Sequence, residues 1–237
     1  MRRDDPNLPT LRTIAQALGD LREQVVFLGG AVAGLLVTDP LAEGVRATRD
    51  VDAVAQAGRA QFQRLQRELA RRGFHEDADS GVICRWIHRA SGVVFDLMPE
   101  NPDVLGFANR WYPYAVATAQ PVALGEGLHI RLATAVAFVA TKLEAFSSRG
   151  RGDVLASHDL EDVLNIVDGR EELVRELGEA TPDVRRAIAT AFAALLARPG
   201  LLDVLPGLIA EPERADVVAG RLRAMAEGRE TTGEGRA

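Results

Sequence analysis

Three aspartates have the surroundings that most clearly suggest chemistry in this chain. Asp50 and Asp52 lie two positions apart in an apolar run that ends at Ala55, and Asp96 lies within a second apolar run, 93–98. Alternate residues of a strand point to the same face, and aspartate is disfavoured in strands. A carboxylate inside an apolar strand is costly to bury unless it is paired or bound to a metal. Three such carboxylates on neighbouring strands would form an oxygen-rich site that suits Mg²⁺ or Mn²⁺.

The aspartate pair has a second interpretation, a strand end that opens into solvent. Aspartates near turns are common, and for Asp50 and Asp52 alone the two interpretations are equally good. Asp96 favours a shared site, because a scaffold without a site would need three chance aspartates in apolar strands. Two metal ions held by such carboxylates can stabilise the attacking and leaving oxygens of a phosphoryl displacement.

A pair of glycines upstream suggests where a phosphate group would bind. Gly29 and Gly30 follow the apolar run 25–28, which predicts a buried strand, and they precede a predicted helix over 31–37. Glycine lets the backbone approach a phosphate, and a helix N-terminus offers unpaired N–H groups. The pair is not a P-loop, since no Gly-Lys-Ser/Thr follows, and it lacks the third glycine of a dinucleotide-binding fingerprint. Many strand–helix turns use Gly-Gly, so the pair alone identifies no ligand.

The chain holds 28 Lys and Arg residues, and Lys142 is the only lysine among them. A GC-rich genome favours arginine codons, which explains why lysine is scarce but not why one remains. A surface lysine can be replaced by arginine at little physical cost, whereas a site that needs a compact ammonium on a flexible stem retains lysine. Codon usage and function are therefore both open explanations for Lys142.

The elements that would position these residues alternate between strands and helices in the first half of the chain. Apolar residues at helical spacing, or in short runs between turn residues, are the signals. They predict helices over 8–21 and 59–72, a hairpin from 82–88 and 93–98, and further strands over 51–55, 114–119 and 128–132.

The second half of the chain has a different character, because no convincing strand pattern follows residue 134. Helices are predicted over 134–148, 158–168, 171–180, 183–197, 201–209 and 212–227. We therefore expect an α/β (α+β) fold with three parts. They are a mixed sheet with flanking helices in residues 1–132, a helical bundle in 133–228 and a flexible polar tail in 229–237.

The order of these motifs resembles the DNA polymerase β-like nucleotidyltransferase superfamily: a strand, Gly29-Gly30, a helix, Asp50-x-Asp52 on the next strand and Asp96 on a later one. Residues 141–146 (Thr-Lys-Leu-Glu-Ala-Phe) and 157–162 (Ser-His-Asp-Leu-Glu-Asp) look like the later motifs of the AbiEii/AbiGii-type toxin nucleotidyltransferases. Those proteins carry a lysine on one helix and Asp-Leu-x-Asp at the start of the next. The resemblance covers roughly residues 25–170.

The resemblance implies a role for each matching residue. Metal ligands would be Asp50, Asp52 and Asp96; the triphosphate would face Gly29 and Gly30; Lys142 would pair with phosphates; and Asp159 or Asp162 would orient Lys142 or a substrate hydroxyl. Many members of the superfamily have Gly-Ser where this chain has Gly-Gly. Backbone N–H groups alone would then contact the phosphate at that point.

The function that the resemblance implies is metal-dependent nucleotidyl transfer. A nucleoside monophosphate would pass from a nucleoside triphosphate to a hydroxyl of RNA or protein, in a toxin-type role with an antitoxin protein as a possible partner. One alternative is a small-molecule nucleotidyltransferase of the aminoglycoside type, which a strongly acidic acceptor pocket would favour. The other is a non-catalytic nucleotide- or partner-binding module on the same fold.

Composition narrows the setting in which the protein works. The net charge of −6 over 237 residues argues against a protein that coats DNA. Cys84 is the single cysteine, which excludes an intramolecular disulfide and fits a reducing cytoplasm. Uncharged stretches fall short of the ~20 residues that span a bilayer, and the first five residues precede no apolar core of a secretory signal. We therefore expect a cytoplasmic protein without a membrane partner.

Overall fold

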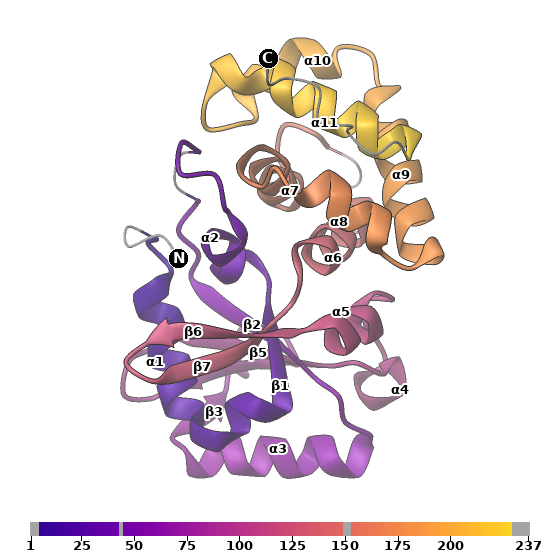
Figure 1. The fold of residues 1–237 in the computed structure, drawn as a ribbon. Coiled ribbons are helices and arrows are strands. Elements are labelled where there is room, and N and C mark those ends of the chain that lie inside the picture. The colour runs from indigo at the N-terminus through magenta and orange to yellow at the C-terminus, as the bar shows by residue number, and fades with distance from the viewer. Residues whose placement is uncertain (1–4, 43–44, 149–152, 229–237) are drawn as a thin grey trace. The chain divides into compact units, whose positions relative to one another are not determined.

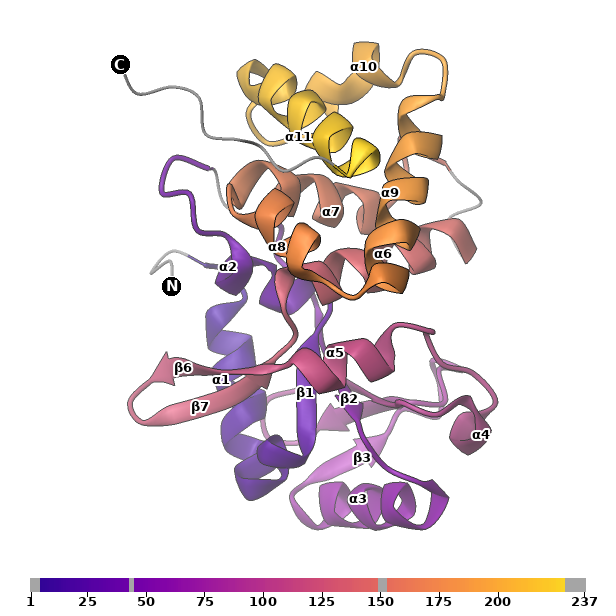
Figure 2. The ribbon, with the colours of Figure 1, turned by 45° about the vertical axis from the view of Figure 1, so that its right-hand side comes forward.

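The computed structural model describes residues 5–42, 45–148 and 153–228, and the chain divides into two compact units. The first unit comprises Met1–Leu35 and Val45–Thr141, and the second comprises Leu36–Gly44 and Lys142–Ala237. Figures 1 and 2 show a sheet with flanking helices in the first unit and helices in the second. The expected α/β fold with a C-terminal helical bundle is therefore confirmed. The predicted tail, 229–237, lies outside the described residues.

Within the described residues, seven strands of the first unit form one mixed sheet in the order β3-β4-β5-β2-β1-β7-β6. The strands are β1 (Val25–Leu28), β2 (Asp50–Ala55), β3 (Phe74–Glu76), β4 (Arg85–His88), β5 (Val94–Pro99), β6 (Gln120–Gly125) and β7 (Leu128–Leu132). Strand β2 runs parallel to β5, β1 runs parallel to β7, and the remaining pairs are antiparallel. The central strands are almost wholly buried, as their apolar runs predict.

The helices that accompany the sheet are short, apart from three. They are α1 (Leu8–Leu18), α2 (Ala33–Leu36), α3 (Arg59–Arg71), α4 (Pro102–Leu105), α5 (Tyr112–Thr118) and α6 (Ala135–Ser148), with 3₁₀ turns η1 (Gly19–Gln24) and η2 (Gly30–Val32). The division between the units falls inside α6, after Thr141. The predicted module boundary after residue 132 coincides with the end of β7 and stays a prediction.

One face of the sheet packs against α5. Val26 of β1, Val54 of β2 and Met98 of β5 belong to one buried cluster with Tyr112 and Val116 of α5. The hydroxyl of Tyr112 donates to the sulfur of Met98 at 2.9 Å. Residues two positions before these strand residues share the same face. The three aspartates therefore belong to the α5 face of the sheet.

The opposite face of the sheet forms a second core. Val51 of β2 and Phe95 of β5 point to this face and are fully buried. The ring of Phe74 lies 5.8 Å from that of Phe95. Helix α3 lies below the sheet in Figures 1 and 2 and buries Phe62 and Leu69. Because both faces carry apolar cores, the strands that hold the aspartates are fixed from both sides.

The second unit consists of helices in its described residues. They are α7 (His158–Gly169), α8 (Leu173–Glu179), α9 (Pro182–Leu196), α10 (Leu201–Val204) and α11 (Ala215–Glu227), with 3₁₀ turns η3 (Leu205–Gly207) and η4 (Pro212–Arg214). Helix α11 packs against α7, α8 and α9. Phe192 and Leu222 are fully buried in the core of this unit. Ser157 caps α7, because its hydroxyl accepts a hydrogen bond from the Leu160 N–H at 3.3 Å.

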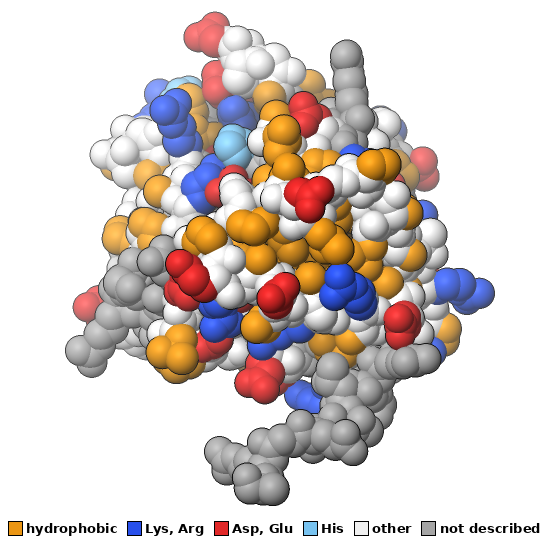
Figure 3. All heavy atoms as spheres, turned by 90° about the horizontal axis from the view of Figure 1, so that it is seen from above, with side chains coloured by type: hydrophobic (Ala, Val, Ile, Leu, Met, Phe, Trp, Pro, Cys, Tyr) orange, Lys and Arg blue, Asp and Glu red, His pale blue; other side chains and the backbone are white. Residues whose placement is uncertain are grey.

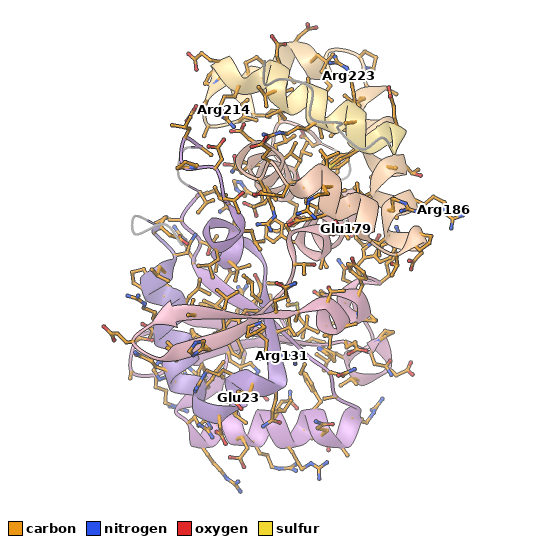
Figure 4. All side chains as sticks on the ribbon, viewed as in Figure 1. Glu23, Arg131, Glu179, Arg186, Arg214 and Arg223 are labelled. Atoms are coloured by element: carbon orange, nitrogen blue, oxygen red, sulfur yellow. The ribbon has the colours of Figure 1, made fainter. Side chains whose placement is uncertain are left out.

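Residues 36–42 belong to the second unit and are tied to the C-terminal end of α7. The N–H groups of Thr38 and Asp39 both donate to the carbonyl of Gly169, at 2.9 and 3.0 Å. Arg214, labelled in Figure 4, donates to Asp39 at 2.8 Å and to Asp168 at 2.6 Å. A segment that is distant in sequence thereby becomes part of the helical core.

Most predicted elements are confirmed. The segment 201–209, expected as one helix, forms the four-residue α10 followed by the 3₁₀ turn η3, and two other segments also differ from the prediction. Residues 114–118 of the expected strand 114–119 lie in α5, Ala119 is its C-cap, and the strand β6 follows. The reason is Pro113, which occupies the first turn of a helix, where its missing N–H costs nothing. Residues 31–37, expected as one helix, form the 3₁₀ turn η2 and the four-residue α2. Two glycines, Gly30 and Gly34, lower the helix propensity of that segment.

Figure 3 views the side on which α10 and α11 lie in Figure 1, and hydrophobic side chains gather in the middle of that view. Exposed apolar residues of these helices are Leu202, Val204 and Val217. Apolar atoms form a large part of any soluble protein surface, so the patch identifies no partner. Among the described residues, no single helix is long and apolar enough to cross a membrane. One bent pair of helical segments, Pro182–Leu196 with Leu201–Gly207, is long and apolar enough when the two are taken together, by length and composition alone.

Candidate functional site

The strand register brings the three aspartates to one face of the sheet. Asp52 of β2 lies directly opposite Asp96 of the parallel strand β5, and Asp50 precedes Asp52 by two positions. The row continues on both sides, with Arg85 of β4 opposite Asp96 and Leu28 of β1 opposite Asp52. Four adjacent strands thus present Arg85, Asp96, Asp52 and Leu28 side by side.

Arg85 forms ion pairs with two of the three aspartates. Its Nε donates to Oδ1 of Asp96 at 2.9 Å and its Nη2 donates to Oδ2 at 2.8 Å, so this pair is bidentate. The same Nη2 donates to Oδ2 of Asp50 at 3.3 Å. The Asp96 side chain is 9% exposed. The hydrogen bonds with Asp96 raise the pKa of Arg85 above its usual value, and they outweigh partial burial, which lowers it. The guanidinium therefore remains charged.

Gly29 lies against Asp52 at the end of β1. The Gly29 φ angle is +77°, in the region that side chains rarely adopt. A methyl group at Gly29 would lie 2.8 Å from the Cβ of Asp52 and closer still to its carboxylate. Glycine is therefore needed twice here, for its backbone conformation and for the space that Asp52 occupies. Gly30 opens η2, so the helix that follows the glycine pair is only a short turn.

The thiol of Cys84 indicates the sign of the local charge. Cys84 precedes Arg85 and is buried. Burial raises the pKa of its thiol to about 11, and the negative charges of Asp96 and Asp52 act in the same direction. Carboxylates have this effect because they oppose the formation of a neighbouring thiolate. Three carboxylates and one guanidinium give these four side chains a formal negative charge, which is the sign that adds to the effect of burial on the thiol.

The donor set of the cluster fits a divalent metal ion. Hard cations such as Mg²⁺ take a few carboxylates and complete their coordination with phosphate oxygens and water. Across residues 5–42, 45–148 and 153–228, no three His, Cys, Asp or Glu side chains are arranged to hold a metal as they stand. At this cluster the Arg85 guanidinium lies within hydrogen-bond distance of both Asp50 and Asp96. It stands where a bound cation would neutralise the same two carboxylates.

A second charged cluster lies in the second unit, around Lys142 of α6. Its Nζ lies 2.9 Å from Oδ1 of Asp159 and 2.7 Å from Oδ2 of Asp162, both on α7. The side chains of Lys142 and Asp162 are 14% and 4% exposed. Burial alone would lower the pKa of Lys142, but the charges of Asp162 and Asp159 outweigh it and raise the pKa. The only lysine of the chain is thus a charged, mostly buried amine between two acids.

The residues that the sequence suggests for a site therefore fall into two groups. Asp50, Asp52 and Asp96 lie together in the first unit, next to the glycine pair, and Lys142 lies with Asp159 and Asp162 in the second unit. Two arginines, Arg46 and Arg49, lie near the aspartate pair in the sequence. The side chain of Arg49 is exposed, and the backbone carbonyl of Arg46 accepts from Asn7 at 2.9 Å.

Arg85 is absent from the residues that the sequence suggests for the site. In a chain with a single lysine among 28 basic residues, an arginine carries no signal by its type. The usable signal is the predicted hairpin. Pairing 82–88 with 93–98 around the turn at 90–92 sets Arg85 opposite Asp96 or an immediate neighbour. A cation opposite a buried carboxylate is then the expected partner.

No protein-family model matches the chain, and no curated protein matches it. Several solved structures are similar to it, among them the following three. An antigenic nucleotidyltransferase-like protein from Paracoccidioides brasiliensis is 20% identical, with 88% of this chain and 94% of that chain covered and a TM-score of 0.48. The antibiotic-resistance factor ANT(2'')-Ia is 13% identical, with 80% and 94% covered and a TM-score of 0.48. JHP933 from Helicobacter pylori is 14% identical, with 96% and 92% covered and a TM-score of 0.47. At these TM-scores the likenesses decide nothing about function.

Proposed function

We propose that the chain is a metal-dependent nucleotidyltransferase, which transfers a nucleoside monophosphate from a nucleoside triphosphate to an acceptor hydroxyl. The observation that carries the proposal is the register of β2 and β5, which sets Asp52 opposite Asp96 with Asp50 on the same face. Aspartates are disfavoured in the middle of a sheet, and three on one face have a clear use as ligands of a divalent metal. The Gly29 turn beside Asp52 supports the proposal, because only a bare backbone fits there.

Each side chain has a role in this proposal that follows from its chemistry. Asp50, Asp52 and Asp96 hold the metal, which when bound lowers the negative charge that the phosphates present to a nucleophile. The acceptor oxygen forms a bond to the α-phosphorus, and the bond to the pyrophosphate oxygen breaks. Asp96 accepts the proton of the acceptor hydroxyl, and pyrophosphate leaves with the electron pair of the broken bond. The protein contributes position and charge rather than a covalent intermediate.

Lys142 has a distinct role in the same proposal, as the ammonium that pairs with phosphate oxygens. Its support is the geometry of the second cluster, in which Asp159 and Asp162 keep the amine charged although it is mostly buried. A mostly buried amine with a raised pKa binds an anion without first taking up a proton. Asp159 orients the amine through its 2.9 Å contact.

The acceptor class rests on the sequence resemblance to the AbiEii-type toxins. That resemblance favours RNA or protein as the acceptor, a toxin role and an antitoxin protein as partner. The test incubates the protein with each α-labelled nucleoside triphosphate and Mg²⁺ or Mn²⁺. Bulk cellular RNA, the protein alone and a cationic aminoglycoside are offered as acceptors in separate reactions.

The labelled product decides between the alternatives. Label on RNA or on protein supports the proposal, whereas label on the aminoglycoside alone supports the small-molecule alternative. Asp52→Asn should abolish labelling, and Asp79→Asn, which changes an exposed aspartate of the same unit, should leave it intact. Absence of label in every reaction, with the protein folded and metal bound, contradicts the proposal and leaves a binding module.

A further inference from the structure

The Arg85 guanidinium occupies a position that the proposed function does not explain. It makes a bidentate pair with Asp96, at 2.8 and 2.9 Å, and reaches Asp50 at 3.3 Å. Two of the three carboxylates proposed as metal ligands are thus already neutralised by a side chain of the same sheet. We propose that the Arg85 guanidinium neutralises Asp96 and Asp50 in the absence of metal, and that a divalent metal has to displace this guanidinium from both carboxylates in order to bind.

The position of Arg85 is built into the sheet rather than reached by a flexible loop. Arg85 opens β4 and lies directly opposite Asp96 in the antiparallel pair with β5, so both side chains point to the same face. Its flanking residues Cys84 and Trp86 are buried, and they fix the strand on which it stands. The Arg85 side chain itself is 25% exposed, which leaves room for the guanidinium to turn away from the carboxylates.

Charge explains why such a cation is useful before the metal arrives. Three carboxylates on one partly buried face repel each other, and one guanidinium removes a third of their charge. By formal charge, three carboxylates and one guanidinium still leave these four side chains net negative. A metal ion that enters competes with Arg85 for Asp96 and Asp50. Arg85 therefore sets the metal concentration at which the site is loaded.

The inference rests on the proposed metal site, and metal binding can be measured without any transfer reaction. Mn²⁺ binding is followed by the loss of the free-ion signal in electron paramagnetic resonance, on the full chain without nucleotide. Arg85→Gln removes the competing charge and keeps a polar side chain. We expect this variant to bind Mn²⁺ at least about tenfold more tightly than the original chain, since one charge-assisted hydrogen bond accounts for a factor of that order.

Two further variants separate competition from a general change in charge. Arg85→Lys keeps a positive charge but loses the bidentate fork, so its affinity should lie between those of the original chain and Arg85→Gln. Arg89→Gln removes an exposed arginine just beyond the same strand and should leave the affinity unchanged. Without metal, Arg85→Gln should melt at a lower temperature than Arg89→Gln, and saturating Mn²⁺ should restore more of the loss.

The outcomes for this inference and for the proposed function are distinct. Equal or weaker Mn²⁺ binding by a folded Arg85→Gln variant contradicts the inference, and so does the absence of Mn²⁺ binding in all variants. If Arg85→Gln binds Mn²⁺ more tightly and no variant transfers nucleotide, competition is established and the transferase proposal fails. If the original chain transfers nucleotide and Arg85→Gln leaves the affinity unchanged, the transferase stands and Arg85 only positions Asp96.

Discussion

At the scale of single residues, the Asp52→Asn substitution tests the charge of Asp52 without changing the size of the side chain. Asparagine has nearly the same size as aspartate, so Asp52→Asn fits the space beside Gly29. The substitution removes one of three neighbouring negative charges, and we expect an unchanged or slightly raised melting temperature without metal. Mn²⁺ binding and nucleotide transfer should both be lost, because the ligand set loses an anionic oxygen.

Thermal melting and Mn²⁺ titration of Asp52→Asn check this prediction, with Asp79→Asn as the matched surface control. A sharply lower melting temperature together with retained transfer would show that Asp52 supports the fold and not the reaction.

A substitution at Gly29, which directly follows β1, tests the close approach between Gly29 and Asp52 from the other side. Gly29→Ala places a methyl group against Asp52 and forces a side chain to a φ of +77° with an extended ψ of −176°, a region that is essentially restricted to glycine. Gly73 supplies a control for positive φ, because its φ angle is +85° but no atom lies within 4 Å of an added methyl. Both variants should lose about 1–3 kcal/mol of unfolding free energy from the backbone. Gly29→Ala should lose about 1–3 kcal/mol more from overpacking.

Urea unfolding of the two glycine variants measures that difference. Equal losses would mean that Asp52 moves aside at no cost, and the close approach would then place no constraint on the turn.

At the scale of elements, the segment 36–42 depends on Asp39. Its carboxylate accepts hydrogen bonds from the Leu41 N–H at 2.9 Å and from Arg214 at 2.8 Å. The Leu41 N–H is the largest cause of the lowered pKa of Asp39, and Arg214 adds to it. A lowered pKa stabilises the fold above the ordinary aspartate pKa of about 4, and the benefit is lost as the pH falls through the lower folded value.

Asp39→Asn should therefore be less stable than the original chain at pH 7, by about 1 kcal/mol, the usual net value of such hydrogen bonds. The difference should shrink as the pH falls below about 4, where the original chain also loses the charge. Urea unfolding at a series of pH values measures both effects. A difference that stays constant down to the acid limit would assign the effect to the amide and not to the charge of Asp39.

The elements could be predicted from the sequence wherever a single local pattern decides them. Strands β1 and β7 and helix α3 follow from apolar runs and spacing. The sequence pattern of residues 114–119 predicts a strand where the structure has the end of α5, because the apolar residues there are too few to show a helical period. Pro113 in the first turn was the signal that favoured a helix. Strand β3 has three residues, which is too short for any period.

The candidate site could be predicted in its residues but not in its pairing. The spacing of Asp50 and Asp52 fixes their common face, because the strand period is two. Their alignment with Asp96 depends on the register of two parallel strands 44 positions apart, Asp52↔Asp96, which no local pattern sets. Arg85 differs, because the hairpin of β4 and β5 limits its partner to Asp96 or an immediate neighbour, and only its residue type, one arginine among many, carried no signal. Register follows from the packing of both sheet faces.

At the scale of the whole molecule, the two charged clusters belong to different compact units. The first cluster is anionic and suits a metal, and the second presents an ammonium that suits an anion. The two clusters should therefore fail in different ways when each is altered, and one pair of variants can show this.

Lys142→Arg is the informative change at the second cluster. Lys142→Ala would leave the 4% exposed Asp162 without its cation, and the loss of a buried partner typically costs about 3–5 kcal/mol, so lost activity would then reflect lost fold. Arginine keeps the charge, and its longer planar fork displaces the point charge from the position that Asp159 and Asp162 define. We expect a folded Lys142→Arg that binds Mn²⁺ with unchanged affinity and transfers nucleotide at least about tenfold more slowly, which is an activation barrier about 1.4 kcal/mol higher.

Asp52→Asn should instead lose Mn²⁺ binding and transfer together. Arg186 lies on α9, and its side chain points outward in Figure 4. Arg186→Lys therefore controls for the exchange of one basic residue type for the other and should change neither the Mn²⁺ affinity nor the transfer rate. Full turnover in Lys142→Arg would show that the only lysine serves the fold of the second unit, and loss of Mn²⁺ binding in that variant would contradict the assignment of the metal to the aspartates alone.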